Sequence, residues 1–438
     1  MSSATAARQA ALETLTRCRR DGAWSGSAME TAVRKYTLDR RDAAFASRLC
    51  LSVLENSALC DFYIDAFCSA KLEPAVRDIL RMGICQLLFF DRVPARAAVG
   101  ESVTLCKSAG LSRASGLVNA VLRRFAEALD SLPEIPGRGT PSFLAVKYSH
   151  PVWLAEYLCE RKGYAFAEAF FAANNRPAPL TIQINTLKIE PELYTRALTR
   201  AEIPFEQDPD LPDCLTLRDM AVQDLPGFEE GLFYVQDRAA RLAVEAAGPK
   251  EGLRVLDACA SPGGKSFAAA IRMKNRGQIL ACDIHEKKLK LVRDGAERLG
   301  ITGLSTRAMD AREYDADLAE RFDLVIADVP CSGLGVIRKK PEIRGKTRES
   351  LGKLPVIQSD ILENVSKYLK KGGILLYSTC TILEEENGQV VTAFLKRHPE
   401  FDTEDFSIGH LRSENGLYSF WPNVDGSDGF FVAKLRKR

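Results

Sequence analysis

No run of eighteen apolar residues occurs in this chain of 438 residues, although 46% of them are hydrophobic. A membrane-spanning helix needs such a run, so the sequence predicts no membrane partner. The first residues, Met1 to Thr5, lack a basic segment followed by an apolar stretch, so we expect no secretory signal. Twelve cysteines at scattered positions, in a chain without such a signal, indicate reduced thiols and a cytoplasmic protein.

The sequence also lacks a pattern typical of metal binding and a large net charge. No two cysteines form a C-x-x-C pair and the four histidines lie far apart, so the sequence predicts no metal site. The net charge is only +2, so any contact with a nucleic acid must come from a local patch. The densest patch is residues 338–348, with six cations and one anion, which either forms a solvated surface or binds the substrate.

The order of segments along the chain predicts three regions. Residues 1–138 are expected to be helical throughout, because apolar residues recur there at helical spacing. Residues 139–235 are expected to form a small α+β insert, with a helical stretch over 151–173 and a strand over 180–185. Residues 236–438 alternate apolar strands with helical segments, which is typical of a mostly parallel sheet with helices on both faces.

The third region is expected to contain four parallel strands and one antiparallel strand that closes the sheet. The parallel strands are predicted at Leu253–Asp257, Gln278–Asp283, Phe322–Asp328 and Gly373–Tyr377, and the closing strand at Gly429–Leu435. In such sheets, ligands bind outside the carboxyl ends of the parallel strands. Side chains that follow these strand ends are therefore the candidate functional residues.

Two cysteines follow two of these strands. Cys331 comes shortly after the strand that ends at Asp328, and Cys380 comes shortly after the strand that ends at Tyr377. Most cysteines fill apolar cores, and that interpretation suits the majority of the twelve. Cys331 and Cys380 come after their apolar runs, where no side chain is needed to fill the core. Cys331, Cys380 and Asp328 together indicate covalent catalysis by a thiol.

A glycine-rich turn follows the strand that ends at Asp257, and it is the candidate cofactor loop. Its residues are Cys259, Ala260, Ser261, Pro262, Gly263, Gly264 and Lys265. Glycines at a strand-to-helix turn let the backbone approach a ligand and present amide groups to it. The loop matches the end of a phosphate-binding G-x-x-x-x-G-K-[ST] motif, but Cys259 replaces the first glycine, and no G-x-G-x-x-G is present. A nucleoside triphosphatase stays an alternative, and an adenosyl ligand without phosphates is favoured.

Acidic residues at successive strand ends support the adenosyl ligand. Asp283 ends the next strand, where an acid can accept the ribose hydroxyls, twenty residues after Gly263. Asp310 ends the following apolar segment, where an acid can accept the adenine amino group, and Asp328 is the third. Each of them alone can equally be a solvated loop acid. Three acids in order at successive strand ends favour a binding site.

At these residues the chain resembles the NOL1/NOP2/Sun family of RNA cytosine-5 methyltransferases, in its Sun (RsmB) branch. The matching motifs are D-A-C-A-S-P-G-G-K at 257–265, D-V-P-C-S-G-L-G at 328–335, S-T-C at 378–380 followed by E-E-E-N at 384–387, and D-G-F-F-V-A at 428–433. Residues 77–88, 94–101 and 116–125 resemble the helical domain of the antitermination factor NusB, which occurs in that branch.

The resemblance implies a Rossmann-like methyltransferase domain that uses S-adenosylmethionine and follows a NusB-like domain and the small α+β insert. It implies that the candidate cofactor loop binds the cofactor with Asp283, Asp310 and Asp328. Cys380 would add to carbon 6 of the cytosine, and Cys331 would help to release the product. Asp328 would stabilise the charge that develops toward N3.

The same resemblance implies the partner. The Sun branch methylates carbon 5 of a cytosine in 16S rRNA, so we expect that RNA as substrate, free or in an early small-subunit particle, and a monomeric enzyme. The expected RNA-binding residues are Arg338, Lys339, Lys340 and Arg344. Another RNA such as tRNA is one alternative, and a catalytically silent RNA-binding assembly factor is another. Gln183 stands where the family usually has an arginine, so any RNA contact of that arginine is altered here.

Overall fold

The strands expected in the third region form the main sheet of the computed structural model, which describes residues 3–218 and 220–438. The strand order is β10-β14-β9-β8-β5-β6-β7, and β13 pairs with β14 outside this path. The five strands from β9 to β7 run parallel, and β14, β10 and β13 are antiparallel to their neighbours. Their bounds are β5 Arg254–Asp257, β6 Gln278–Asp283, β7 Leu304–Ala308, β8 Phe322–Asp328, β9 Leu369–Thr379, β10 Phe401–Thr403, β13 Leu417–Phe420 and β14 Phe430–Lys437. The predicted mostly parallel sheet with an antiparallel closing strand is confirmed.

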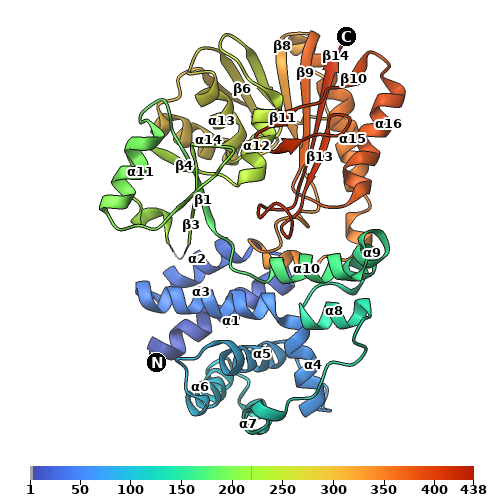
Figure 1. The fold of residues 1–438 in the computed structure, drawn as a ribbon. Helices are drawn as coiled ribbons and strands as arrows, with labels where there is room; N and C mark the ends of the chain where they lie inside the picture. Colours follow the sequence, from blue (N-terminus) through green and yellow to red (C-terminus); the bar gives the residue numbers. More distant parts are fainter. Residues whose placement is uncertain (1–2, 219) are drawn as a thin grey trace. The chain divides into compact units, whose positions relative to one another are not determined.

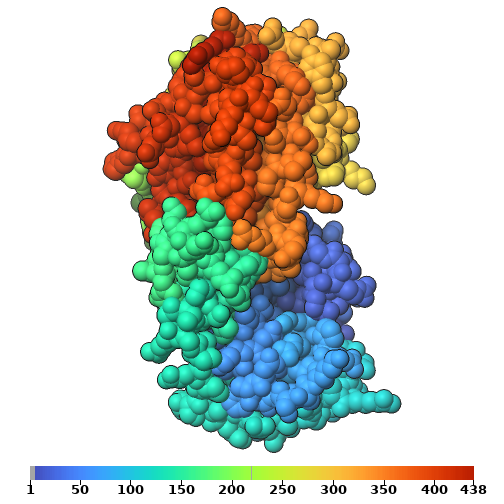
Figure 2. Space-filling model, turned by 90° about the vertical axis from the view of Figure 1, so that its right-hand side faces the viewer, coloured from blue at the N-terminus to red at the C-terminus, as the bar shows by residue number. Residues whose placement is uncertain are grey.

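Helices cover both faces of this sheet because successive residues of each buried strand point to opposite sides. On β5, Val255 packs in one apolar cluster with α12, α13 and α14, whereas Leu256 packs in another with α15 and α16. Figure 1 shows the two groups of helices on either side of the strands, and in Figure 2 the orange side chains of α15 and α16 cover one face. The helix bounds are α12 Arg238–Ala247, α13 Gly264–Arg272, α14 Glu286–Leu299, α15 Leu354–Val365 and α16 Gly388–Arg397.

Several elements differ from the sequence prediction. The segment before Asp310 is a strand, β7, but it is not apolar as expected, because its residues Leu-Ser-Thr-Arg-Ala are mostly polar and partly exposed. Strand β9 begins at Leu369 rather than Gly373, since its first residues extend past the buried part of the sheet. The single helical stretch predicted over 151–173 is two helices, separated at Gly163, whose φ of +86° a helix cannot contain.

A smaller antiparallel sheet, in the order β2-β3-β1-β4, precedes the main sheet along the chain. Helix α11 packs on it through Tyr194 and Leu198, against Ile182 and Phe233. Gln183, the residue that replaces the family's arginine, is fully buried, and its side-chain amide donates to the backbone oxygen of Gln236. The bounds are β1 Leu180–Ile184, β2 Glu206–Gln207, β3 Cys214–Leu217, β4 Phe233–Val235 and α11 Pro191–Arg200, and a separate two-stranded ribbon pairs β11 Ser407–Ile408 with β12 Leu411–Arg412.

The chain forms two compact units. One contains the residues up to Arg176 together with Ile337–Arg348, and the other contains Pro177–Val336 and Glu349–Arg438. The first unit is helical, as expected: α1 Ser3–Asp21, α2 Ser25–Tyr36, α3 Arg40–Glu55, α4 Ser57–Phe67, α5 Pro74–Phe89, α6 Ala95–Ser108, α7 Ser115–Glu127, α8 Pro141–Lys147, α9 Val152–Lys162 and α10 Tyr164–Asn174. In the described part of the chain, no helix is both long and apolar enough to cross a membrane. The region boundaries predicted after residues 138 and 235 remain predictions.

The basic segment 338–348 is part of the helical unit, and Arg344 holds it there. Arg344 is only 8% exposed, and burial lowers its pKa to about 10. Its guanidinium donates to the backbone oxygens of Glu55, Tyr148, Ser149 and Asn174 and to Oδ1 of Asn175. Arg344 therefore satisfies buried acceptors of the unit itself.

We expect Arg344→Ala to destabilise the protein by roughly 2–5 kcal/mol, because several buried backbone oxygens lose their donor and each costs about 1–3 kcal/mol. Thermal unfolding followed by circular dichroism should show a clearly lower midpoint. Arg348→Ala is the matched control, because Arg348 is exposed on the same segment. Equal midpoints for the two variants would contradict the anchoring role of Arg344.

Candidate active site

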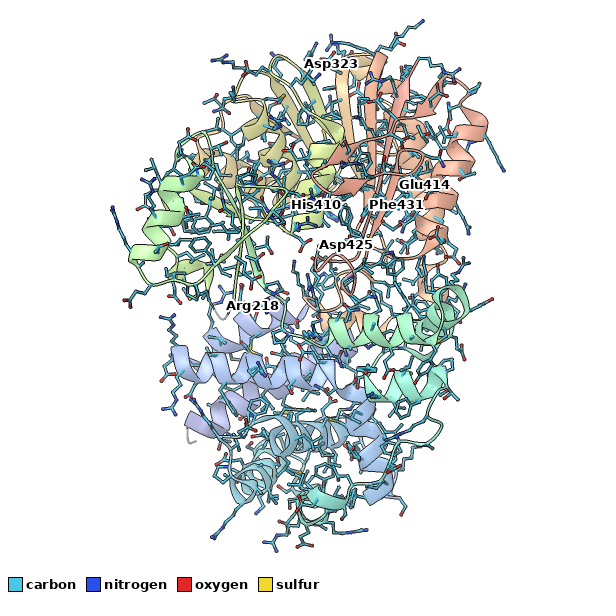
Figure 3. All side chains as sticks on the ribbon, in the orientation of Figure 1. Arg218, Asp323, His410, Glu414, Asp425 and Phe431 are labelled. Carbon is cyan, nitrogen blue, oxygen red and sulfur yellow. The ribbon has the colours of Figure 1, made fainter. Side chains whose placement is uncertain are left out.

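The two candidate thiols meet at the carboxyl ends of neighbouring strands. Strands β8 and β9 pair in parallel with Asp328 opposite Ser378, so the chain leaves both strands at the same edge of the sheet. Cys331 and Cys380 follow directly, and their Sγ atoms are 3.3 Å apart. Asp323, labelled in Figure 3, marks the beginning of β8, and the thiols lie beyond its opposite end.

The environment keeps one of these thiols protonated. The pKa of Cys331 is raised well above its usual value, first by the contact with the Cys380 thiol and then by burial. The charges of Cys380, Glu386 and Asp328 act in the same direction. A thiolate is the nucleophilic form of cysteine, and two thiols in contact do not ionise together readily, so at most one of this pair is the nucleophile at a given moment.

Asp328 is held in place from two sides. Its Oδ2 accepts a hydrogen bond from Lys265 Nζ at 2.6 Å, and its Oδ1 accepts one from Ser378 Oγ at 2.7 Å. The Lys265 ammonium also lies 5.0 Å from the centre of the Phe430 ring. Asp328 is therefore a fixed acceptor beside the two thiols, and Lys265 is committed to it rather than extended toward a phosphate.

The candidate cofactor loop turns tightly between β5 and α13. The amide of Ala260 donates to the Cys282 oxygen at 2.7 Å, which ties the loop to the end of β6. Gly263 has a φ of +112°, and a Cβ there would lie 2.4 Å from the Phe267 ring, so only glycine fits. Beneath the loop Asp257 is fully buried, and burial raises its pKa to about 6.

The structure places the other two predicted acids at the ends of neighbouring strands. Asp283 ends β6, and its Oδ1 accepts the backbone N–H of His285 at 2.9 Å. Asp310 follows β7 and forms a two-pronged ion pair with Arg312, which lowers the pKa of Asp310. A carboxylate oxygen can accept more than one hydrogen bond, so an adenine amino group at Asp310 would share these oxygens with Arg312.

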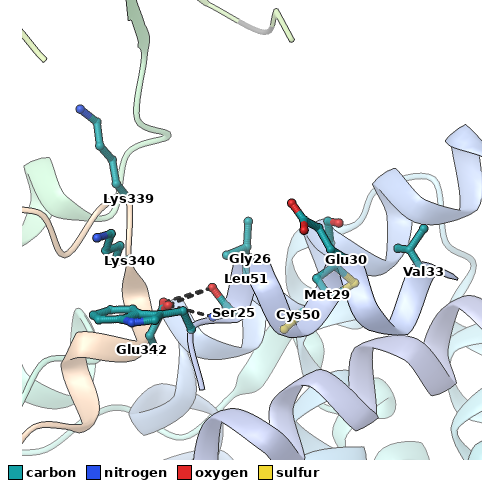
Figure 4. A pocket seen from close by; sticks show the side chains of 12 residues that line it. Ser25, Gly26, Met29, Glu30, Val33, Cys50, Leu51, Lys339, Lys340 and Glu342 are labelled. Carbon is teal, nitrogen blue, oxygen red and sulfur yellow. Dashed lines mark hydrogen bonds between the residues drawn. The ribbon is translucent and has the colours of Figure 1, made fainter. Parts of the chain in front are cut away.

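The predicted RNA-binding residues lie in the helical unit. Lys339 and Lys340 are exposed, and Lys340 Nζ lies 4.7 Å above the ring of Trp24. Figure 4 shows both lysines at the rim of a pocket of about 590 Å³ that α2, α3 and the basic segment line. Arg338 is half-buried, and Arg344 is engaged internally, so we do not carry Arg344 into the proposed RNA surface.

Two residues that form hydrogen bonds with the Cys331 loop, Glu386 and Gln358, were not predicted from the sequence. Glu386 is 1% exposed and its Oε2 accepts the N–H of Ser332, which follows Cys331. The Gln358 amide donates to the Pro330 oxygen and to Glu386 Oε2. The E-E-E-N motif was the only available signal, and it does not tell which glutamate is buried. Among the described residues, no three His, Cys, Asp or Glu side chains are grouped so as to hold a metal ion.

Comparison with known proteins identifies the family. The sequence model of the 16S rRNA methyltransferase RsmB/F matches residues 244–436, that of the NusB family matches residues 5–127, and that of the ferredoxin-like domain of RsmF/B-like methyltransferases matches residues 150–223. A probable ribosomal RNA small subunit methyltransferase B of Bacillus subtilis is 32% identical to this chain, over 99% of each. The chain belongs to the RsmB/F family of 16S rRNA methyltransferases. The resemblance stated from the motifs, including the NusB-like domain, is confirmed.

Solved structures agree with this membership. The crystal structure of PH0851 is 26% identical with a TM-score of 0.84, and the match covers 100% of this chain and 99% of that one. A methyltransferase homolog protein from Pyrococcus horikoshii is 27% identical with a TM-score of 0.60, over 67% of this chain and 98% of its own. As an RsmB/F family member, the protein is a methyltransferase and S-adenosylmethionine is its cofactor.

The residues present fit this cofactor. Asp257 Oδ1 is buried and has no hydrogen-bond partner among the described residues, so a polar acceptor lies beneath the loop. Gly263 lets the loop turn tightly, because the Phe267 ring fills the space that a Cβ there would need. Asp283 keeps one carboxylate oxygen for ribose hydroxyls, since only its Oδ1 has a partner in the described chain. Asp257, Gly263 and Asp283 are therefore the residues that would hold S-adenosylmethionine.

Replacing Asp283 by Ala should weaken cofactor binding by about ten- to a hundredfold, because hydrogen bonds to a charged acceptor contribute roughly 1.5–3 kcal/mol. Calorimetric titration with S-adenosylmethionine measures this, and RNA affinity should not change. Asp294→Ala is the control, because Asp294 is an exposed acid on α14 that pairs with Lys290. An unaltered dissociation constant in Asp283→Ala would remove Asp283 from the binding site.

Proposed function

We propose that this protein methylates carbon 5 of a cytosine in 16S rRNA through a covalent bond between Cys380 and carbon 6. The observation that carries the proposal is the meeting of two thiols, 3.3 Å apart, beside Asp328 at the ends of β8 and β9. The relatives supply the substrate class, because the Bacillus subtilis protein is named a ribosomal RNA small subunit methyltransferase. Methylation of a pyrimidine at carbon 5 requires such a thiol, and cytosine is the pyrimidine of the family that the motifs at 328–335 and 378–380 resemble.

Cys380 activates the base. Carbon 5 of cytosine is a poor nucleophile, and a thiolate that adds to carbon 6 converts the ring into an enamine whose carbon 5 can attack. S-adenosylmethionine supplies an electrophilic methyl group when it is bound. Asp328, which Lys265 and Ser378 hold in place, would share a proton with N3 of the base and so stabilise the negative charge that builds there.

Cys331 acts after methyl transfer. The proton on carbon 5 must leave before carbon 5 and carbon 6 can regain their double bond and the Cys380 thiolate can depart. Cys331 lies against Cys380, so it would lie close to carbon 5 while Cys380 is bonded to carbon 6, and the resemblance of the motifs assigns this later step to it. The target base must be unpaired or turned out of its stack to reach these groups.

The helical unit supplies a surface that fits single-stranded RNA. Such surfaces combine cations that follow the phosphates with aromatic rings on which bases stack. Lys339 and Lys340 are exposed, and Lys340 lies over the ring of Trp24, a residue that is 48% exposed. We assign the phosphate contacts to these two lysines and to Arg338.

The roles of the two thiols can be separated with single variants. We expect Cys380→Ala to abolish both methyl transfer and the covalent adduct with RNA that contains 5-fluorocytosine. Cys331→Ala should keep methyl transfer but accumulate enzyme bound covalently to methylated RNA, even on RNA that contains only ordinary cytosine, because release is impaired. Denaturing gel electrophoresis detects the adduct, and labelled S-adenosylmethionine measures the transfer.

Cys159→Ala is the control for these variants, because Cys159 lies half-buried on α9 and outside the site. It should behave like the unsubstituted enzyme. An adduct that persists in Cys380→Ala and disappears in Cys331→Ala would reverse the two roles. Sequencing of 5-methylcytosine in 16S rRNA and tRNA from a deletion strain identifies the substrate, and a loss confined to tRNA would contradict the rRNA assignment.

The RNA surface has a distinct test. RNA affinity falls as salt rises, and each phosphate contact adds about 0.7 for single strands, or 0.9 for duplex, to the slope of the logarithm of the binding constant against the logarithm of the salt concentration. Changing Lys339 and Lys340 together to Ala should weaken RNA binding and flatten the slope by roughly one to two units, with cofactor affinity unchanged. The paired control is Lys370 and Lys371 changed to Ala, at the opposite end of β9 from Cys380. An unchanged slope would mean that residues 338–348 form a solvated surface and do not contact phosphates.

A further inference from the structure

The pocket between α2, α3 and the basic segment has an apolar floor. Met29 is 8% exposed and Cys50 is 1% exposed, and Val33 and Leu51 continue the apolar lining. All of these residues belong to the helical unit. The volume of about 590 Å³ lies within the range of pockets that bind small molecules. The interior of this pocket has no role in the proposed methyl transfer, so its occupant is an open question that its lining can answer.

The two ends of the pocket differ in charge. Lys339 and Lys340 lie at one end, and the exposed residue Glu30 lies toward the other (Figure 4). The Glu30 carboxylate has no hydrogen bond or ion pair with another residue that the structure describes. Glu342, a second acid of the lining, is already engaged, because it accepts hydrogen bonds from the backbone N–H of Ser25 at 2.9 Å and from the Ser25 hydroxyl at 3.2 Å. Glu30 is therefore the carboxylate that a ligand in the pocket can use.

A single nucleotide of an RNA strand has the same polarity as this pocket. Its phosphate is an anion that suits the lysines, and the faces of its base suit the apolar floor. The edge of the base would then lie toward Glu30, whose carboxylate only accepts hydrogen bonds. Among the four bases, only guanine presents two adjacent donors, N1–H and the N2 amino group, on its Watson–Crick edge. Guanine is therefore the base that both oxygens of Glu30 can bind.

We propose that this pocket binds one unpaired guanine of the RNA substrate, and that Glu30 accepts hydrogen bonds from its N1–H and its N2 amino group. The proposal rests on the proposed function and adds to it a second base-binding site, distinct from the one for the cytosine that Cys380 attacks. Trp24 carries the Lys340 ammonium 4.7 Å from the centre of its ring and is still 48% exposed. Part of Trp24 is therefore open to a base at the rim, where aromatic side chains contribute by stacking.

Gly26 allows the pocket to be filled without disturbing the fold. It lines the pocket from α2, and a Cβ built on it would have no atom within 4 Å. Glycine disfavours helices, so Gly26→Leu should have an unchanged or higher thermal midpoint while its side chain takes up space that the base needs. Gly100→Leu is the matched control, because Gly100 is an exposed glycine of α6 with equally open surroundings. Glu30→Gln is the second test variant, since it keeps the shape of the side chain and replaces one acceptor by a donor.

Base preference is measured by fluorescence anisotropy of the full-length protein with short labelled uridine RNAs whose central base is guanine, adenine, cytosine or inosine. The unsubstituted protein should bind the guanine RNA about tenfold more tightly than the adenine or cytosine RNA, as one bidentate contact to a base provides. Inosine keeps N1–H but lacks the amino group, so its affinity should lie between. Gly26→Leu and Glu30→Gln should lose the preference for guanine, and Gly100→Leu should keep it.

Equal affinity of the unsubstituted protein for the four RNAs would overturn the proposal, because the pocket would then not distinguish the bases. A preference for guanine that persists in Gly26→Leu would overturn the assignment to this pocket. One that is lost in Gly26→Leu but persists in Glu30→Gln would overturn the role of Glu30.

Methyl transfer to 16S rRNA separates this proposal from the proposed function. In Gly26→Leu, the KM for the RNA should rise by roughly tenfold while kcat stays the same, because the pocket contributes binding and takes no part in the chemistry. If the unsubstituted protein produces no 5-methylcytosine in 16S rRNA, the proposed function itself fails. If it methylates 16S rRNA and Gly26→Leu has the same KM, only the guanine site fails.

Discussion

The in-register parallel pairing of β8 with β9 is the constraint on which the site depends. It places Asp328 opposite Ser378 and brings the chain out of both strands at one edge, so that Cys331 and Cys380 meet. A shift of one residue would turn every side chain of one strand to the other face. The apolar residues of both strands are buried on both faces of the sheet, for example Ile326 on one and Val325 on the other. Such a shift is therefore costly, and the core fixes the geometry of the thiols.

A close backbone contact extends this constraint to the closing strand. The Gly335 amide donates to the Cys380 oxygen, and the Gly335 oxygen accepts from the amide of Gly429, just before β14. A Cβ on Gly335 would lie 1.8 Å from the Gly429 oxygen, so the two chains touch where neither has a side chain. The loops after β8 and β9 and the start of β14 thus form one layer. The motif at 328–335 and the motif at 428–433 therefore lie side by side although they are far apart in the sequence.

The sequence allows the strand ends to be predicted, but not the contacts of polar side chains. Strands β5, β6 and β8 are short apolar runs that any parallel sheet must bury, and their ends identify the candidate residues. Arg344 lies among other cations and is typical of a solvated surface, yet it occupies a buried position that only the folded helical unit creates. Glu386 has the same chemistry as its two preceding neighbours. Only the packing of α15 and the Cys331 loop determines which glutamate is buried.

The charges around the cofactor loop have a consequence for turnover. Burial and the nearby acids Asp257, Asp328 and Asp283 hold the pKa of the Cys259 thiol well above its usual value, so the pocket resists an additional negative charge. The same field attracts a positive charge, and Lys265 only partly offsets it because it pairs with Asp328. S-adenosylmethionine carries a positive sulfonium, whereas the product left after methyl transfer is neutral at that sulfur. If the loop holds the cofactor as proposed, these acids would favour S-adenosylmethionine over its product, and electrostatic attraction would be lost at the moment when the product must leave.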